Sequence, residues 1–140
     1  MTAAEFLSLE IDDGTKQLNA CLDGLAEGQI DERLTDDGMT IREILAHLAE
    51  TCVAVRTANE GKSYDWGSYE PADRSLSALR ADLFRLREVA KASCLEGEDD
   101  KRLLNGYGYL VSHDCYHIGQ LALLRLKADP SWNSDALYGG

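Results

Sequence analysis

The sequence predicts an all-α protein, an antiparallel four-helix bundle with a docked C-terminal tail. Four stretches carry apolar residues at steps of three and four, and no stretch shows a convincing alternation of period two. Only two prolines occur in 140 residues, Pro71 and Pro130, so long helices are permitted. The length and the 44% hydrophobic content suit one domain, residues 1–140, around a single core.

The first two helices are predicted over residues 3–26 and 41–59. In the first, Gly14 weakens the helix and Gly28 ends it. The second begins at a capping box, in which the Thr40 hydroxyl and the Glu43 carboxylate each accept a hydrogen bond from a free backbone N–H.

A loop is predicted over residues 61–74, because GKSYDWGSYEPADR is rich in glycine, serine and proline. Three aromatic residues in this one loop, Tyr64, Trp66 and Tyr69, indicate a lid or an interface.

Two further helices are predicted over residues 75–93 and 101–127, separated by the acidic turn LEGEDD. The tail DPSWNSDALYGG keeps three large apolar residues and is therefore expected to pack on the bundle: Trp132, Leu137 and Tyr138.

Fourteen Lys and Arg against 25 Asp and Glu give a net charge of −11, which repels phosphate backbones and anionic lipid headgroups. Nucleic acids and membranes are therefore not expected as partners. No apolar run reaches the ~18 residues of a membrane helix, and the N-terminus lacks the features of a signal peptide, so we expect a cytoplasmic protein. The cysteines form no C-x-x-C pair and are interpreted as small buried hydrophobes: Cys21, Cys52, Cys94 and Cys115.

The three histidines are the most informative residues. His113 and His117 form an H-x-x-x-H pair about 40° apart on one helix face, and His47 lies at the edge of the apolar stripe of the helix over residues 41–59. Three neutral imidazoles can bind one divalent ion and leave a position for water or substrate. The alternative is that they are ordinary surface or core histidines. The metal is favoured because every histidine of the chain could join the same site.

Other metal motifs are missing, since there is neither an H-E-x-x-H nor a Glu-x-x-His pair. Cys115 lies two residues from each helical histidine, so it points to the far side and is not expected to be a ligand. Glu43 and Glu50 flank His47 and are candidates to orient its ring or to accept a proton from bound water, although helix glutamates of this kind are usually only solvated.

Asp114 falls on the apolar side of its helix, where an unpaired charge is expensive. It is therefore expected to have an ion-pair partner, and Arg125, eleven residues on and on the same face, is one possibility.

Two stretches, GMTIREILAHLAET and YLVSHDCYHIGQLALLR, resemble the DinB-like superfamily of metal-binding four-helix bundles, which includes YfiT-like proteins. The residues that carry the resemblance are His47, Leu48, His113, His117, Gly119, Gln120 and Leu121. It implies that the three histidines bind one divalent ion, commonly zinc or nickel, with water completing the shell, and that homodimers form. Met39 and Ile118 stand where that superfamily often has an aromatic and a basic residue.

The resemblance also implies a metal-dependent transferase that uses a small thiol cofactor, such as bacillithiol or mycothiol. The bound ion would lower the pKa of a thiol or water and supply the nucleophile for an S-transferase or a hydrolase. An anionic thiol needs a local basic residue, for which Arg42, Arg56 and Arg125 are candidates. The alternative is a non-catalytic metal-binding or stress-response protein, in which the ion is structural or sensory.

Overall fold

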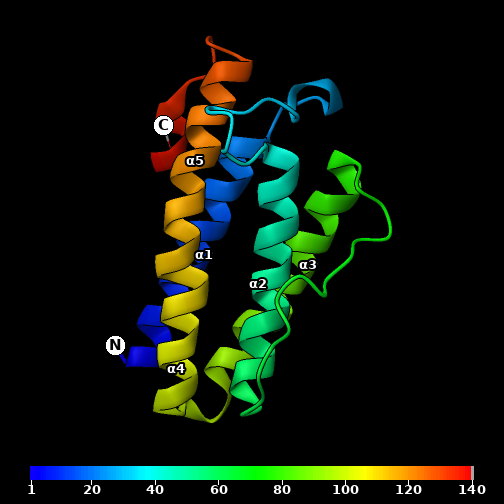
Figure 1. Ribbon diagram of the computed structural model, residues 1–140. Helices are drawn as coiled ribbons and strands as arrows, with labels where there is room; N and C mark the ends of the chain where they lie inside the picture. Colours follow the sequence, from blue (N-terminus) through cyan, green and yellow to red (C-terminus); the bar gives the residue numbers. More distant parts are fainter. Residues whose placement is uncertain (140) are drawn as a thin grey trace.

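The computed structural model describes residues 1–139, and within that range it is helical, with no strand (Figure 1). The helices in chain order are α1 Ala3–Leu22, η1 Glu27–Gln29, α2 Ile41–Asn59, α3 Leu76–Leu95, η2 Glu96–Glu98, α4 Asp100–Gly106, η3 Tyr107–Ser112, α5 His113–Ala128 and η4 Ser134–Tyr138. Across residues 1–139, no helix combines the length and the apolar character that crossing a membrane would require.

The long helices do not simply alternate in direction. α4, η3 and α5 follow one another as one rod that runs the same way as α1, whereas α2 and α3 both run the opposite way (Figure 1). Arg42 in the first turn of α2 donates to the carbonyl of Arg74, just before α3, and Asn59 at the end of α2 donates to Ser93 near the end of α3. The expected antiparallel arrangement therefore does not hold for α2 and α3.

The connection between α2 and α3 explains this parallel pair. Residues 60–75 carry no helix, and a fully extended chain of that length reaches roughly 50 Å, against about 29 Å for α2 itself. The predicted loop over residues 61–74 is therefore present, and it returns along the bundle instead of making a short turn.

α1 begins at a complete capping box, in which the Thr2 hydroxyl accepts from the N–H of Glu5 and the Glu5 carboxylate accepts from the N–H of Thr2. The helix ends at Leu22, four residues before its predicted end. Gly24 follows with φ +76°, a left-handed conformation that glycine adopts without strain. Gly24, and not Gly28, therefore marks the end of this helix.

α2 begins as predicted, because the Thr40 hydroxyl accepts from the N–H of Glu43 at 3.1 Å. The reciprocal half of the predicted capping box is not formed. The Glu43 carboxylate is instead paired with the guanidinium of Arg33, which lies in the loop before α2. This ion pair ties the preceding loop to the first turn of the helix.

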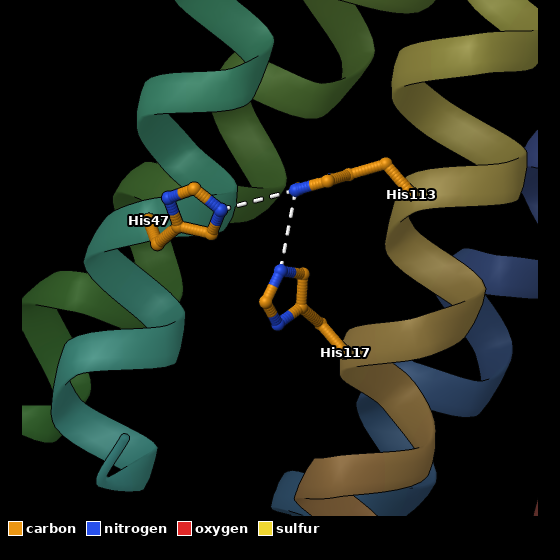
Figure 2. Close-up of side chains that lie close together, drawn as sticks. All are labelled: His47, His113 and His117. Carbon is orange, nitrogen blue, oxygen red and sulfur yellow. Dashed lines mark hydrogen bonds between the residues drawn. The ribbon is translucent and has the colours of Figure 1, made fainter. Parts of the chain in front are cut away.

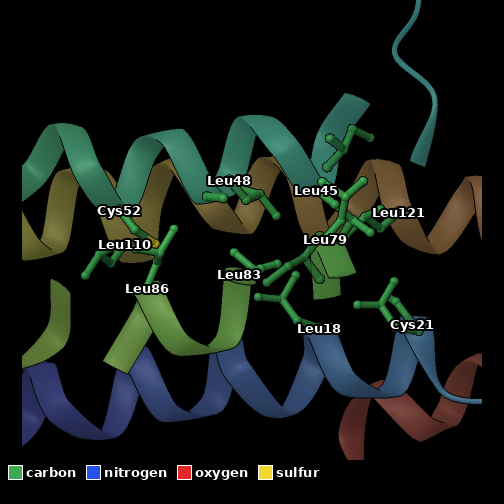
Figure 3. Close-up of a cluster of buried hydrophobic side chains, with 14 of the residues drawn as sticks. Leu18, Cys21, Leu45, Leu48, Cys52, Leu79, Leu83, Leu86, Leu110 and Leu121 are labelled. Carbon is green, nitrogen blue, oxygen red and sulfur yellow. The ribbon is translucent and has the colours of Figure 1, made fainter. Parts of the chain in front are cut away.

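Apolar side chains from α1, α2, α3, η3 and α5 meet in one core (Figure 3). Cys21, Cys52 and Cys94 are buried in it, and burial raises the pKa of Cys21 to about 11 and that of Cys52 to about 12. The interpretation as small buried hydrophobes is thus confirmed for these three. It is wrong for Cys115, which is exposed on the outer face of α5.

The C-terminal segment lies against the bundle, with η4 in contact with α1. Trp132 and Leu137 pack against the core, and the guanidinium of Arg125 lies 5.6 Å from the centre of the Trp132 ring. Tyr138 does not share this burial and is 85% exposed.

Candidate metal centre

The structure brings together the three histidines that the sequence singled out (Figure 2). His47 projects from α2, and His113 and His117 project from the first two turns of α5. The Nε2 atom of His113 lies 3.0 Å from Nε2 of His47 and 3.2 Å from Nε2 of His117. One candidate ligand atom from each ring lies within 4.8 Å of the others. The three rings therefore converge on one small space between the two helices.

The outer nitrogens of two rings are held by groups that only accept hydrogen bonds. Nδ1 of His113 lies 3.0 Å from a carboxylate oxygen of Asp114, and Nδ1 of His117 lies 2.7 Å from the amide oxygen of Gln120. These partners place the hydrogen on Nδ1, so the Nε2 atoms of the neutral rings turn lone pairs inward. Two facing lone pairs do not satisfy each other, whereas a cation between them would.

The donor set and its spacing fit a transition-metal ion. Zinc–imidazole bonds of 2.0–2.1 Å in a tetrahedral shell separate two ligand nitrogens by about 3.4 Å, close to the separations of 3.0 and 3.2 Å found here. Imidazole suits zinc and nickel, among other divalent ions. Three ligands also leave at least one coordination position open.

Burial favours the ligand form of two of these histidines. The pKa of His47 and that of His117 are both lowered, mainly because burial penalises the charged ring, and the neighbouring histidines act in the same direction. A ring that stays neutral keeps its lone pair for a metal.

Asp114 is buried, as its position on the apolar side of the helix predicted, but its partner is Arg87 of α3. Both side chains are 1% exposed. One carboxylate oxygen accepts from Arg87 and the other faces His113, so the same carboxylate links the core to the histidine cluster. The proposed partner Arg125 lies on the same rod but eleven residues on, which is about 16 Å along a helix.

Arg87 is itself fixed from several sides. Its guanidinium donates to the Thr15 hydroxyl at 2.7 Å and to the carbonyls of Ile11 and Leu110 at 3.0 and 3.3 Å. These partners lie on α1 and η3, so one buried side chain joins three parts of the bundle directly behind His113. The position of that ring is thereby tied to the packing of the core.

The rod that carries two of the histidines is not a uniform α-helix. Tyr107–Ser112 form a turn of π-helix, and the α-helix resumes at His113. The sequence predicted one continuous helix over residues 101–127 without this insertion. π-helical turns inside α-helices occur frequently at functional sites, and this one immediately precedes His113, the first histidine of α5.

Glu50 anchors the aromatic loop. Its carboxylate accepts hydrogen bonds from the Tyr64 hydroxyl and from the backbone N–H groups of Gly67 and Tyr69, at 3.0–3.3 Å. The loop is thereby held so that the ring of Trp66 lies 6.3 Å from the ring of His47, centre to centre. This placement resembles a lid.

Neither of the two glutamates proposed for His47 contacts it through a hydrogen bond in the described chain, since Glu43 is paired with Arg33 and Glu50 with the loop. The contacts that hold the rings of α5 come from Asp114 and Gln120 instead. Gln120 was recognisable from its spacing, because a residue three positions after His117 lies on the same helix face.

Two of the three arginines suggested for an anionic thiol, Arg42 and Arg125, have partners away from the histidines. Arg42 is paired with Glu27 and Asp31, and Arg125 donates to the carbonyl of Cys21. A cavity of about 430 Å³ adjoins His113, and no arginine or lysine lines it. The described residues around the cavity thus offer no cation to a negatively charged ligand.

The model of the DinB superfamily matches residues 10–121, a range that contains all three histidines, Arg87 and Gln120. Among curated proteins and among solved structures, no match to the chain was found. The family match covers well over half of the chain and coincides with the helices that build the histidine cluster, and on this ground the chain belongs to the DinB superfamily.

Proposed function

We propose that His47, His113 and His117 together bind one divalent metal ion, zinc or nickel, and that the protein is a metal-dependent transferase that uses a small thiol. The observation that carries this proposal is the inward orientation of the His113 and His117 lone pairs beside His47. Two rings whose outer nitrogens are occupied by Asp114 and Gln120 have only their Nε2 atoms to offer.

A bound ion would lower the pKa of a thiol or water at its open position and supply a nucleophile at neutral pH. The chain's own residues orient the histidine rings and cover one side of the site. Asp114 and Gln120 fix the ring orientation, as the outer partners of metal-binding histidines do. The ring of Trp66 lies 6.3 Å from that of His47 and would cover one side of a bound ligand.

The cavity beside His113 favours a catalytic role over a purely structural ion. Its volume of about 430 Å³ lies within the usual range for small-molecule sites. A structural ion needs no such space beside one of its ligands, so the cavity supports the enzyme over the non-catalytic alternative.

The test is elemental analysis of untagged protein, followed by turnover assays of the metal-loaded protein with a panel of low-molecular-weight thiols and electrophiles. We expect thiol-dependent product formation by the wild type and only background rates for His117→Ala. Stoichiometric metal without turnover for any pair would instead support the structural or sensory ion.

A further inference from the structure

The cavity beside His113 connects the metal centre with the aromatic loop. Trp66 of the loop and Tyr109 of η3 form part of its wall, and His113 reaches it from the histidine cluster. The other lining residues are Thr51, Leu104, Asn105 and Gly108. A ligand in this cavity would therefore lie next to a metal-binding ring and under the loop that Glu50 anchors.

The wall of the cavity is apolar and partly flat. The rings of Trp66 and Tyr109 are parallel to within 2°, with their centres 6.4 Å apart. The Thr51 hydroxyl donates to the carbonyl of His47, and the Asn105 amide donates to Asn59, so these two polar side chains already have protein partners. Flat apolar surfaces of this kind favour aromatic groups, which gain from stacking in addition to burial.

We propose that this cavity binds a flat apolar group of one or two aromatic rings, attached to a thiol that reaches the metal centre. This proposal rests on the function proposed above and names the substrate class. A cavity of about 150 Å³ holds benzene, so about 430 Å³ accommodates a larger ring system. A carboxylate-bearing thiol is disfavoured, because its charge would lose water without gaining a cation from the lining residues.

Gly108 offers a direct way to fill the cavity. A Cβ atom at Gly108, a residue that lines the cavity, would have no neighbouring side chain or distant backbone atom within 4 Å, and the φ of this residue is not positive, so a larger side chain can begin there without a clash at Cβ. Gly119 on α5 has the same free surroundings but does not line the cavity. Gly108→Leu and Gly119→Leu are therefore a matched pair of variants.

The first arm of the experiment uses metal-free protein that carries Trp132→Phe, so that Trp66 is the only tryptophan. Benzyl alcohol, a probe with the ring but without the thiol, should change the Trp66 fluorescence in a saturable way. Gly108→Leu should weaken this binding at least tenfold, and Gly119→Leu should leave it unchanged.

The second arm uses protein loaded with cobalt(II), in which bound thiolate produces a near-ultraviolet absorption band. Benzyl mercaptan should bind at least tenfold more tightly than 3-mercaptopropionate. This preference should disappear in Gly108→Leu and persist in Gly119→Leu. Trp66→Ala, which alters a half-exposed residue, should also reduce the preference for benzyl mercaptan. This variant replaces Gly108→Leu in the test if Gly108→Leu does not fold.

The two arms separate the two proposals. If cobalt does not bind, the function proposed above is wrong, and the first arm still decides whether the cavity takes an aromatic ring. If cobalt and thiolates bind but both glycine variants keep the same preference, the aromatic substrate class is wrong and the metal site stands.

Discussion

The two histidines of α5 are oriented by different kinds of side chain. Asp114, which holds His113, is buried and ion-paired with Arg87, whereas Gln120, which holds His117, is half-buried and uncharged. Removing either partner of a buried ion pair leaves an uncompensated charge and commonly costs about 3–5 kcal/mol. Gln120 can be removed without that penalty, so it allows ring orientation to be tested separately from stability.

Gln120→Ala should lower the affinity for zinc by about 10–100-fold, because the His117 ring loses the bond that fixes its tautomer and rotation. The free energy of unfolding of the metal-free protein should change by only about 1 kcal/mol. A competition titration with a chromophoric chelator measures the affinity. Gln17→Ala on α1 is the control, and equal zinc affinity of the two variants would refute a positioning role for Gln120.

The lowered pKa of His47 and of His117 predicts how the stability of the metal-free protein depends on pH. Below the ordinary pKa of about 6.5, these two histidines bind protons in the unfolded chain but remain neutral in the folded protein. Proton binding therefore stabilises the unfolded state relative to the folded state. Stability should therefore fall as the pH decreases from about 6.5 towards the lowered values.

Urea unfolding of metal-free protein at pH 7.5 and pH 5 measures this effect. A variant with both His47→Gln and His117→Gln should lose less stability between the two pH values than the wild type. Identical losses would mean that the two rings do not titrate abnormally in the folded protein.

At the level of the elements, apolar periodicity predicted the helices well but not their directions. Periodicity shows which helix face is buried, and the Thr40 cap shows where α2 begins. Neither signal says whether a long connection crosses the bundle, and for that reason the parallel pair of α2 and α3 was not predicted. Contact between the ends of two helices, such as that of Asn59 with Ser93, arises only in the folded bundle.

The π-helical turn was missed for a related reason. Leu110 within the π-helical turn and His117 after it are both buried, at the three- and four-residue steps that an α-helix would also show. The sequence pattern is therefore compatible with a continuous α-helix as well.

Gly14 illustrates a packing requirement that propensity alone does not show. A Cβ at this position would lie 2.7 Å from Nη2 of Arg87, an atom held by the carbonyls of Ile11 and Leu110. Gly14→Ala should therefore destabilise the protein by about 1–3 kcal/mol, although alanine favours helix by up to about 1 kcal/mol. Gly119→Ala, in open surroundings, should be neutral or stabilising. Urea unfolding compares the two, and a stabilising Gly14→Ala would contradict the tight contact.

For the whole molecule, the grouping of the three histidines was predictable, but the surroundings of the cluster were not. On an α-helix, the H-x-x-x-H spacing places His113 and His117 on the same face, independently of how the rest of the chain packs. The contacts of Trp66 with His47 and of Asp114 with Arg87 join residues that are distant in sequence, and no local pattern encodes them.

A homodimer remains an expectation, and the structure suggests a different surface for it from the aromatic loop. Tyr69 of that loop packs against the core, and the half-exposed Trp66 lies beside His47. Phe6, Leu104 and Tyr107 are each more than half exposed and surround one small cavity between α1 and the rod that contains α4 and η3. Exposed apolar residues grouped in this way are typical of interfaces.

Sedimentation at micromolar concentration should therefore show a species of twice the 15.4 kDa chain mass. Phe6→Glu should shift it towards the monomer because the charge would be buried in the interface, while Leu34→Glu in the loop before α2 should not. A wild type that sediments only as a monomer would rule out the dimer, and a dimer unaffected by Phe6→Glu would place the interface elsewhere.

The direct test of the three-histidine site is a calorimetric titration of metal-free protein with zinc. The wild type should bind one ion per chain, and so should Cys115→Ala, because that thiol lies on the outer face of α5. His117→Ala should weaken zinc binding by more than about 100-fold. This loss exceeds the one expected for Gln120→Ala, which removes only the hydrogen bond to the outer nitrogen of the ring. Equal affinity and stoichiometry for the wild type and His117→Ala would contradict a metal centre at these histidines.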